Sequence, residues 1–308
     1  MDVDEHRPAG PEVRSPKSEA KRKDGKGFGF SVCHEQIHGC HTDMKKLAIL
    51  VMAMLATSGG WPGAFAADTP AAATEKARIL LVTGVDYPGH HWRETAPVLA
   101  AALGKDPRLE VVTVEDPGFL DSTAISKYDL IMLHFQNWQQ PGPGERAREN
   151  LRQFVEGGKG VVLVHFACGA WFNEWPEFGK IAGRTWAGPG PGVRQHDPFG
   201  MFRVEVVQPA HAIVRGMADF DTQDELYTCL IGDQPIEVVA QAKSKADGKD
   251  YPMAFVSRYG KGRTFHCVLG HDAKALSNPP VQELYRRGCA WAAGLAPVAS
   301  QSAQPTNK

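Results

Sequence analysis

The sequence predicts an α/β protein built around a mainly parallel sheet. Apolar runs at 77–83, 129–134 and 160–165 consist of β-branched and aliphatic residues, which is typical of buried strands. Amphipathic segments at 92–103 and 145–155 separate such runs, and strands that alternate with helices at this spacing are joined by right-handed crossovers. The 308 residues are 43% hydrophobic and 22% charged, as in ordinary globular proteins.

Each of these elements has its own signal in the sequence. The helix expected at 92–103 places four apolar residues on one side, namely Val98, Leu99, Ala102 and Leu103. A further strand is expected at 109–114. The helix at 145–155 is followed by Gly157-Gly158, and glycine commonly ends a helix.

The second half of the domain has shorter elements. Segment 173–182 predicts a short helix, and the Gly- and Pro-rich segment 186–200 predicts a long loop whose size suggests that it covers something. The remaining strands are expected at 202–207, 236–242, 253–259 and 263–269, the last two forming a hairpin around Gly260-Lys261-Gly262. An apolar stripe predicts a final helix at 280–293.

The N-terminal part of the chain is predicted to lie outside the domain. Residues 1–43 are polar without an apolar period, so we expect them to be disordered and to reflect an over-extended start of translation. A basic start, an apolar run and the motif Ala64-Phe65-Ala66 predict a signal peptide at 44–66, with an apolar anchor helix as the alternative. Cleavage would leave a periplasmic or secreted protein without a stable membrane span. It would comprise a linker at 67–76, a domain at 77–296 and a disordered tail at 297–308.

The net charge argues against one class of binding partner, and the positions of the cysteines indicate what roles they can have. A net charge of -1 provides no basic surface, so nucleic acid is not expected as a partner. Cys33 and Cys40, with neighbouring histidines, resemble a small metal cluster, but their spacing matches no zinc finger. Cys267 and Cys289 follow apolar patterns and are expected in the core. The sequence assigns neither a disulfide pair nor an oligomeric state.

Histidines follow four of the expected strands, and these are the main candidates for a site. In open α/β sheets, ligands bind in the crevice beyond the carboxyl ends of the strands. We expect His91, His134 and His165 as ligands of Zn²⁺ or another divalent metal, although no tight metal motif is present. A histidine bonded to backbone inside the core is the alternative for His134 and His165, and a capping role at a helix N-terminus is the alternative for His91.

Catalytic and substrate-binding roles are expected nearby. His165 and His271 are the expected general bases, with Glu225 or Asp224 as the acid, and Asp272 either orients His271 or caps a turn. The tryptophans either stack on sugar rings or pack within loops. The residues expected to contact substrate are Asp86, His90, His91, Trp92, Trp171, His196, His211 and Tyr227.

Cys168 is the other candidate for chemistry. The run from Val164 to Gly169 resembles the sharp strand-to-helix turn that presents a nucleophile, and His165 is close in sequence. The small residues of such a turn are absent, since Phe166 stands two positions before the cysteine. A packed, structural cysteine is therefore the alternative.

Several of these segments together resemble the ThuA-like (trehalose utilisation) family. They are Gly84 to Trp92, Val164-His165, His211 with Gly216, Asp224-Glu225-Leu226-Tyr227 and Leu269-Gly270-His271-Asp272, within residues 77–295. The resemblance implies a class I glutamine amidotransferase-like fold, a flavodoxin-like three-layer α/β/α sandwich. It also implies a link to disaccharides and oxidised (3-keto) sugars. The Cys-His-Glu triad of the amidotransferases has no counterpart here, so glutaminase activity is not expected.

Three hypotheses follow. The first is an exported enzyme that acts on a disaccharide or keto-sugar through a strand-end histidine and acid site, with or without a metal, by hydrolysis, elimination or isomerisation. The second is a non-catalytic carbohydrate-binding protein. The third is a cysteine-dependent amidohydrolase that uses Cys168.

Overall fold

Nine strands form one mixed sheet in the computed structural model, which describes residues 76–298. The strand order is β2-β1-β3-β4-β11-β10-β9-β6-β7. Five neighbouring strands run parallel: β2 (Leu109–Val114), β1 (Ala77–Val82), β3 (Leu130–Leu133), β4 (Gly160–Val164) and β11 (Gly262–Cys267). Their carboxyl ends therefore meet at one edge, where the candidate histidines lie.

The other half of the sheet is antiparallel. It is formed by β10 (Asp250–Tyr259), β9 (Glu237–Lys243), β6 (Gly200–Val206) and β7 (Phe220–Asp224). The expected hairpin joins β10 to β11 across Gly260, which has a φ of 56° that glycine adopts readily. A separate two-stranded ribbon pairs β5 (Thr185–Trp186) with β8 (Leu230–Ile231).

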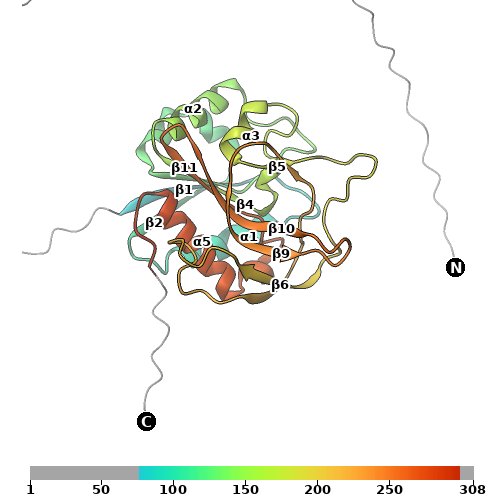
Figure 1. The fold of residues 1–308 in the computed structure, drawn as a ribbon. Coiled ribbons are helices and arrows are strands. Elements are labelled where there is room, and N and C mark those ends of the chain that lie inside the picture. Colours follow the sequence, from blue (N-terminus) through green and yellow to red (C-terminus); the bar gives the residue numbers. More distant parts are fainter. Residues whose placement is uncertain (1–75, 299–308) are drawn as a thin grey trace, which may run out of the picture. The chain divides into compact units, whose positions relative to one another are not determined.

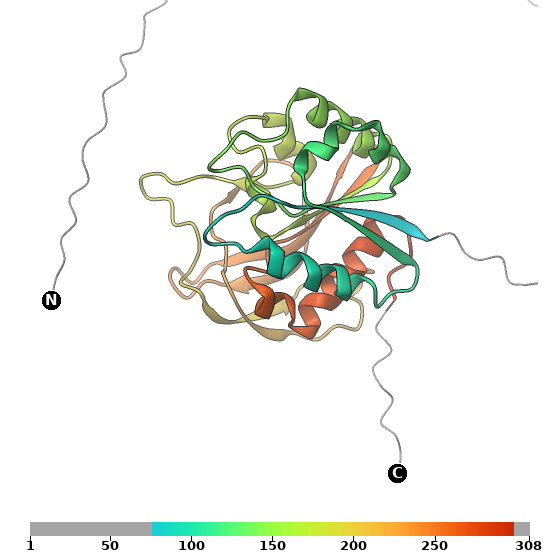
Figure 2. The same cartoon turned by 180° about the vertical axis from the view of Figure 1, so that it is seen from behind.

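Helices cover both faces of the sheet (Figures 1 and 2). One face carries α1 (Trp92–Leu103), α4 (Ala273–Leu276) and α5 (Pro279–Ala292), and the other carries α2 (Glu145–Glu156) and α3 (Pro176–Ala182). Ile79 and Leu81 of β1 face the first core, whereas Leu80 and Val82 face the second. The predicted α/β class and parallel core are confirmed.

Some elements differ from expectation. The helix expected at 173–182 begins only at Pro176, because Asn173 has a φ of 58° and proline favours the first helical position. Strand β7 was not expected, since Phe220 is its only large apolar residue. Three 3₁₀ helices, Pro117–Asp121, Thr123–Lys127 and His165–Gly169, were not expected either.

Between β5 and β6 the chain runs out from the body as a long loop (Figure 1). A hydrogen bond of 2.8 Å from Gln195 Nε2 to the carbonyl of Gly188 closes its base. The amide of Asp197 donates to the carbonyl of Leu226 at 2.9 Å, which fixes the end of the loop beside the strand-end site. The expected loop therefore lies next to the site.

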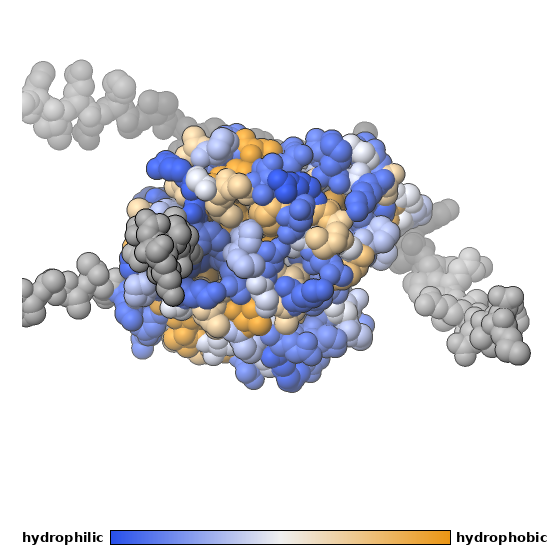
Figure 3. All heavy atoms as spheres, turned by 90° about the horizontal axis from the view of Figure 1, so that it is seen from below, coloured by the Kyte–Doolittle hydropathy of each residue, from blue (hydrophilic) through white to orange (hydrophobic). Residues whose placement is uncertain are grey.

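The surface view in Figure 3 shows mostly hydrophilic residues with small hydrophobic patches between them. Within residues 76–298, no helix combines the length and the apolar character that a bilayer crossing requires. The predicted signal peptide, the linker, the cluster at Cys33 and Cys40 and most of the tail lie outside the described residues. Cys267 and Cys289 lie in the core, as expected.

Candidate functional site

Three histidines and one glutamate meet at the carboxyl edge of the sheet. His90, His165, Glu225 and His271 each offer one ligand atom, and these four atoms lie within 4.8 Å of one another. They follow β1, β4, β7 and β11. The first, second and fourth of these strands belong to the parallel half of the sheet, whereas β7 is the far edge strand and reaches the centre through hydrogen bonds of Asp224 with residues 270–271. We call these four residues the His/Glu centre.

His165 occupies the sharp turn that follows β4. Its backbone has a φ of 43°, a strained conformation for a residue other than glycine, and such strain is concentrated at functional sites. Its Nδ1 lies 2.6 Å from the carbonyl oxygen of Val268, which can only accept, so Nδ1 carries the proton. Its Nε2 therefore presents a lone pair to the centre, where the Tyr227 hydroxyl donates to it at 2.9 Å.

Glu225 lies between two of the imidazoles. Its Oε2 is 3.3 Å from His271 Nδ1 and 3.5 Å from His165 Nε2. Within residues 76–298, His271 Nδ1 nevertheless forms no hydrogen bond. The other oxygen, Oε1, is 3.6 Å from His196 Nε2.

The charges of the His/Glu centre are set by burial and by these neighbours. Burial lowers the pKa of His90 to about 2, helped by the charges of His165 and His271, so this imidazole is neutral at physiological pH. Burial alone would raise the pKa of Glu225, but the positive charge that the neighbouring imidazoles of His165 and His271 carry when protonated holds it below its ordinary value. Burial likewise opposes the charge on His271, yet Glu225 raises its pKa.

Asp224 fixes the relative position of two members of the centre. It is fully buried, and its carboxylate accepts hydrogen bonds from the amides of Gly270 at 2.7 Å, His271 at 3.1 Å and Glu225 at 2.8 Å. Burial raises the pKa of Asp224, against the effect of these bonds. The carboxylate therefore ties the end of β7 to the turn after β11.

Aromatic rings surround the His90 imidazole. Its ring stacks on Phe166 with a centroid distance of 4.5 Å and lies 5.6 Å from Tyr87 and 6.0 Å from Trp138. His90 Nδ1 is buried and has no hydrogen-bond partner among residues 76–298. Phe199, from the end of the long loop, lies 5.2 Å from the ring of His271 and is 41% exposed.

His91 and His134, which were expected as metal ligands with His165, lie outside the His/Glu centre. His134 is fully buried, with its ring nitrogens 3.0 Å from Thr83 Oγ1 and 3.2 Å from Thr95 Oγ1, so neither nitrogen is free. His91 is exposed at the start of α1. His90 and His271 take the places expected for these two residues.

Two tryptophans that were expected to contact substrate form hydrogen bonds within the fold instead. Trp171 and Trp92 are buried, and their indole N–H groups donate to the Pro143 carbonyl and to Asp86, each at 2.8 Å. Asp86 also pairs with Arg93. These contacts leave the two indoles little freedom to bind a ligand.

Two further candidates lie apart from the centre. His211 packs on Trp291 at 5.7 Å, and its Nδ1 accepts from the amide of Ile213. Asp272 caps α4 by accepting from the amide of Ala275 at 2.7 Å, which is the capping role left open by the sequence. By contrast, His196 and Tyr227 do lie against the centre, as their contacts with Glu225 and His165 indicate.

Cys168 is poorly placed to act as a nucleophile. It is 1% exposed, and burial raises the pKa of its thiol well above the ordinary value. The strained position of the turn belongs to His165 instead. All four cysteines of residues 76–298 are free thiols.

The roles of Tyr87, Phe166, Phe199 and Asp224 had weaker signals in the sequence. Asp224 stands beside Glu225 and had been weighed as an acid, but its three backbone partners depend on a contact with residues 270–271. The ring contacts of Tyr87, Phe166 and Phe199 depend on loop conformations, which show no periodic pattern.

The fold and the His/Glu centre together define a flavodoxin-like α/β protein with imidazoles and a carboxylate at its strand ends. A family model described as "Trehalose utilisation" matches residues 78–292, and the chain belongs to this ThuA family. A comparison with curated proteins found no match.

Solved structures show the same fold. A ThuA-like protein from Parabacteroides merdae ATCC 43184 is 25% identical, with a TM-score of 0.64 over 73% of this chain and 93% of that chain. A ThuA-like protein from Bacteroides uniformis ATCC 8492 is 17% identical, with a TM-score of 0.57 over 76% of this chain and 95% of that chain. A β-galactosidase from Rahnella sp. R3 is 14% identical, with a TM-score of 0.51 over 72% of this chain and 32% of that chain. The last two likenesses concern the fold alone.

Proposed function

We propose that this protein is an enzyme of carbohydrate metabolism that acts on a disaccharide or keto-sugar at a divalent-metal site formed by the His/Glu centre. The convergence of four ligand atoms within 4.8 Å carries the proposal. The family description, trehalose utilisation, supports a sugar as substrate. The expected export, which depends on residues 44–66, is part of the same proposal.

Two of the distances within the centre match those expected around a metal ion. Around a tetrahedral Zn²⁺ with bonds of about 2.0–2.2 Å, neighbouring ligand atoms lie roughly 3.3–3.6 Å apart. The two spacings from Glu225 Oε2, 3.3 Å to His271 Nδ1 and 3.5 Å to His165 Nε2, fall in this interval. Imidazoles with one carboxylate suit Zn²⁺ and other first-row divalent ions.

The hydrogen bonds around the centre support the same proposal. His90 Nδ1 and His271 Nδ1 are buried without hydrogen bonds, which is costly unless another group satisfies them. His165 Nδ1 donates to the Val268 carbonyl, as the second nitrogen of a metal-bound histidine usually does. His90 remains neutral because its pKa is about 2, and neutral imidazole is the form that binds metals.

The residues around the centre are suited to move protons. A divalent ion held there would polarise the carbonyl of a keto-sugar and acidify the adjacent carbon. His196 Nδ1 lies 2.7 Å from the Asp197 carbonyl, and its Nε2 faces Glu225 Oε1 at 3.6 Å. Burial raises the pKa of Tyr227 well above its ordinary value, so the phenol keeps its proton, and its hydroxyl lies at the centre, 2.9 Å from His165 Nε2. Proton transfer next to a carbonyl, leading to isomerisation or elimination, is the reaction class that these groups support best.

The test is a ¹H NMR measurement with 3-keto-trehalose in D₂O. Zinc-loaded protein should exchange the proton next to the carbonyl or convert the sugar, and chelator-treated protein or a His165→Ala variant should not. His211→Ala, a histidine outside the centre, is the matched control and should keep full activity. Sugar binding with neither exchange nor conversion would identify a non-catalytic carbohydrate-binding protein instead.

A further inference from the structure

The end of the long loop brings two side chains to the His/Glu centre, one from each side of Asp197. His196 Nε2 lies 3.6 Å from Glu225 Oε1. The ring of Phe199 lies 5.2 Å from that of His271. Both side chains contact members of the centre, yet they come from a segment that belongs to no helix or strand. Their positions therefore depend on whatever fixes this end of the loop.

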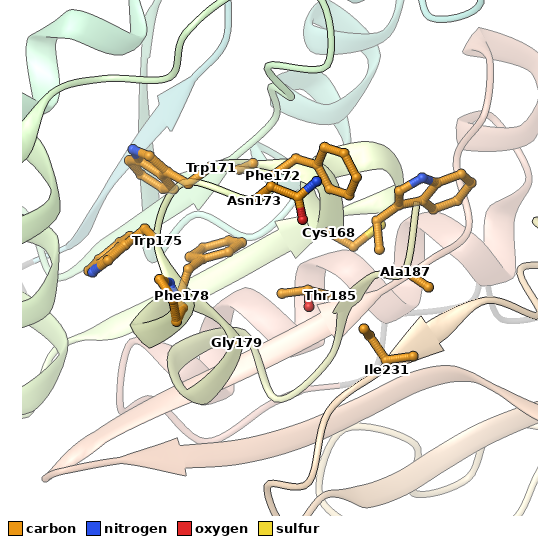
Figure 4. A pocket seen from close by; sticks show the side chains of 13 residues that line it. Cys168, Trp171, Phe172, Asn173, Trp175, Phe178, Gly179, Thr185, Ala187 and Ile231 are labelled. Carbon is orange, nitrogen blue, oxygen red and sulfur yellow. The ribbon is translucent and has the colours of Figure 1, made fainter. Parts of the chain in front are cut away.

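The start of the loop does not determine these positions. Figure 4 shows Ala187, at the start of the loop, at the side of a cavity of about 290 Å³, so the chain is not closely packed on that side. The amide of Ala187 donates to the carbonyl of Cys229 at 3.2 Å. Three glycines follow within residues 188–192, and the conformational freedom of glycine prevents the start of the loop from dictating the conformation of its end.

Asp197 fixes the end of the loop through its buried carboxylate. The residue is only 6% exposed, and its Oδ1 and Oδ2 accept from the Ser244 hydroxyl and the Lys245 amide, each at 2.8 Å. Arg194 Nε lies 3.5 Å from Oδ1, and Arg194 Nη2 donates to Asp247 at 2.9 Å. Three of these partners belong to the turn between β9 and β10. The end of the loop cannot leave this turn without stranding buried polar groups, which is costly.

The main chain of Asp197 orients the His196 ring. Its amide donates to the carbonyl of Leu226 at 2.9 Å, next to Glu225 in the sequence. Its carbonyl oxygen lies 2.7 Å from His196 Nδ1 and can only accept, so Nδ1 carries a proton and Nε2 is the nitrogen directed at Glu225. One buried residue thus fixes both the place and the tautomer of the imidazole.

We propose that Asp197 is a positioning residue of the site. Its carboxylate, held by Ser244 and Lys245, keeps His196 at the His/Glu centre in the tautomer that leaves Nε2 to exchange protons with a bound substrate. The effect on turnover rests on the proposed function, whereas the tautomer depends on neither metal nor substrate. The inference predicts that a contact with the turn between β9 and β10, outside the centre, controls the chemistry at the centre.

The first experiment records the imidazole ¹H–¹⁵N NMR spectrum of the full chain at about pH 8.5, where a histidine with the ordinary pKa of about 6.5 is neutral. His196→Gln assigns the signals of the ring. Wild type should carry a proton on Nδ1, and Asp197→Ala should show a mixture of both tautomers. Ser244→Ala, which removes one of the two bonds and no atom of the loop, should change the signals in the same direction. Asp106→Ala, a change of another buried aspartate at the opposite edge of the parallel strands, should leave them unchanged.

The second experiment measures kcat with 3-keto-trehalose on the zinc-loaded full chain. Asp197→Ala should lower kcat about tenfold or more in wild type, but about twofold or less in a His196→Gln background, because Asp197 acts through that imidazole. A carboxylate that only stabilises the fold would lower kcat by the same factor in both backgrounds.

That equal loss would overturn the inference. So would a wild-type ring protonated on Nε2 alone, or an unchanged tautomer in both Asp197→Ala and Ser244→Ala. A wild-type chain that neither binds zinc nor converts the sugar would contradict the proposed function instead, and the NMR spectra would still decide whether Asp197 positions His196.

Discussion

Replacement of Asp224 by Asn should weaken metal binding although every ligand atom of the His/Glu centre stays in the chain. The buried carboxylate accepts from the amides of Glu225, Gly270 and His271. It thereby holds Glu225 Oε2 and His271 Nδ1 3.3 Å apart. Asparagine keeps one acceptor oxygen but turns an NH₂ group toward at least one of these donors.

The expected losses of stability and of metal affinity in Asp224→Asn follow from the hydrogen bond that is lost. A buried N–H left without a partner costs about 1–3 kcal/mol, so the free energy of unfolding of the metal-free protein should fall by that amount. Loss of a group that orients metal ligands typically weakens metal affinity by about 10–100-fold. Urea unfolding measures the first quantity, and competition with a chromophoric zinc chelator measures the second.

Asp106→Asn is the matched control. Asp106 is also buried, at 2% exposure, but it bonds Arg108 just before β2, at the opposite edge of the parallel strands. This variant should lose stability and keep its zinc affinity. If Asp224→Asn is destabilised and yet binds zinc as tightly as wild type, the positioning role assigned to Asp224 is wrong.

Four further outcomes are expected. His134→Ala should lose about 1–3 kcal/mol of stability, because the buried Thr83 hydroxyl loses its partner and the Thr95 hydroxyl loses one of two. Metal analysis should still find the ion, and a missing ion would show that His134 is a ligand. In urea unfolding, the metal-free protein should become less stable as pH falls from 6.5 to 4. Burial lowers the pKa of His134 to about 3 and of His266 to about 4, whereas histidine in the unfolded chain has a pKa near 6.5, so the unfolded chain binds more protons in this window. The free energy of unfolding should therefore fall by roughly 1 kcal/mol per pH unit for each of the two histidines. A free energy of unfolding that does not change over this pH range would refute the prediction. Tyr227→Phe should keep its zinc and turn over about 10²–10⁴-fold more slowly, whereas unchanged turnover would exclude a proton donor here. Iodoacetamide should leave Cys168 unlabelled in native protein, as mass spectrometry can show, because burial raises its thiol pKa; labelling with loss of activity would favour the cysteine hypothesis.

Elements with a clear apolar period were predictable from the sequence. The helix at 92–103 and the strand at 109–114 have the expected bounds, because local patterns determine them. Strand β7 was not predictable in this way. Its inward positions are Phe220, Thr222 and Asp224, of which only the first is hydrophobic, and pairing with β6 determines the strand.

The candidate site was predictable where it depends on the ends of predicted strands, and not where it depends on contacts between distant residues. Parallel strands bring their carboxyl ends together, so His165 and His271 could be expected near one another. The choice between His90 and His91 could not be made, because both lie in a turn without a period and only the stacking of His90 on Phe166 distinguishes them. The role of His134 depends on two threonines that are 51 and 39 residues away in sequence.

The most direct test of the metal centre is anomalous X-ray diffraction from crystals of the zinc-loaded chain, combined with elemental analysis. We expect one ion per chain, at about 2.0–2.2 Å from a ligand atom of each of His90, His165, Glu225 and His271. A chain that takes up no ion at saturating zinc, or an ion bound elsewhere in the molecule, would contradict the account.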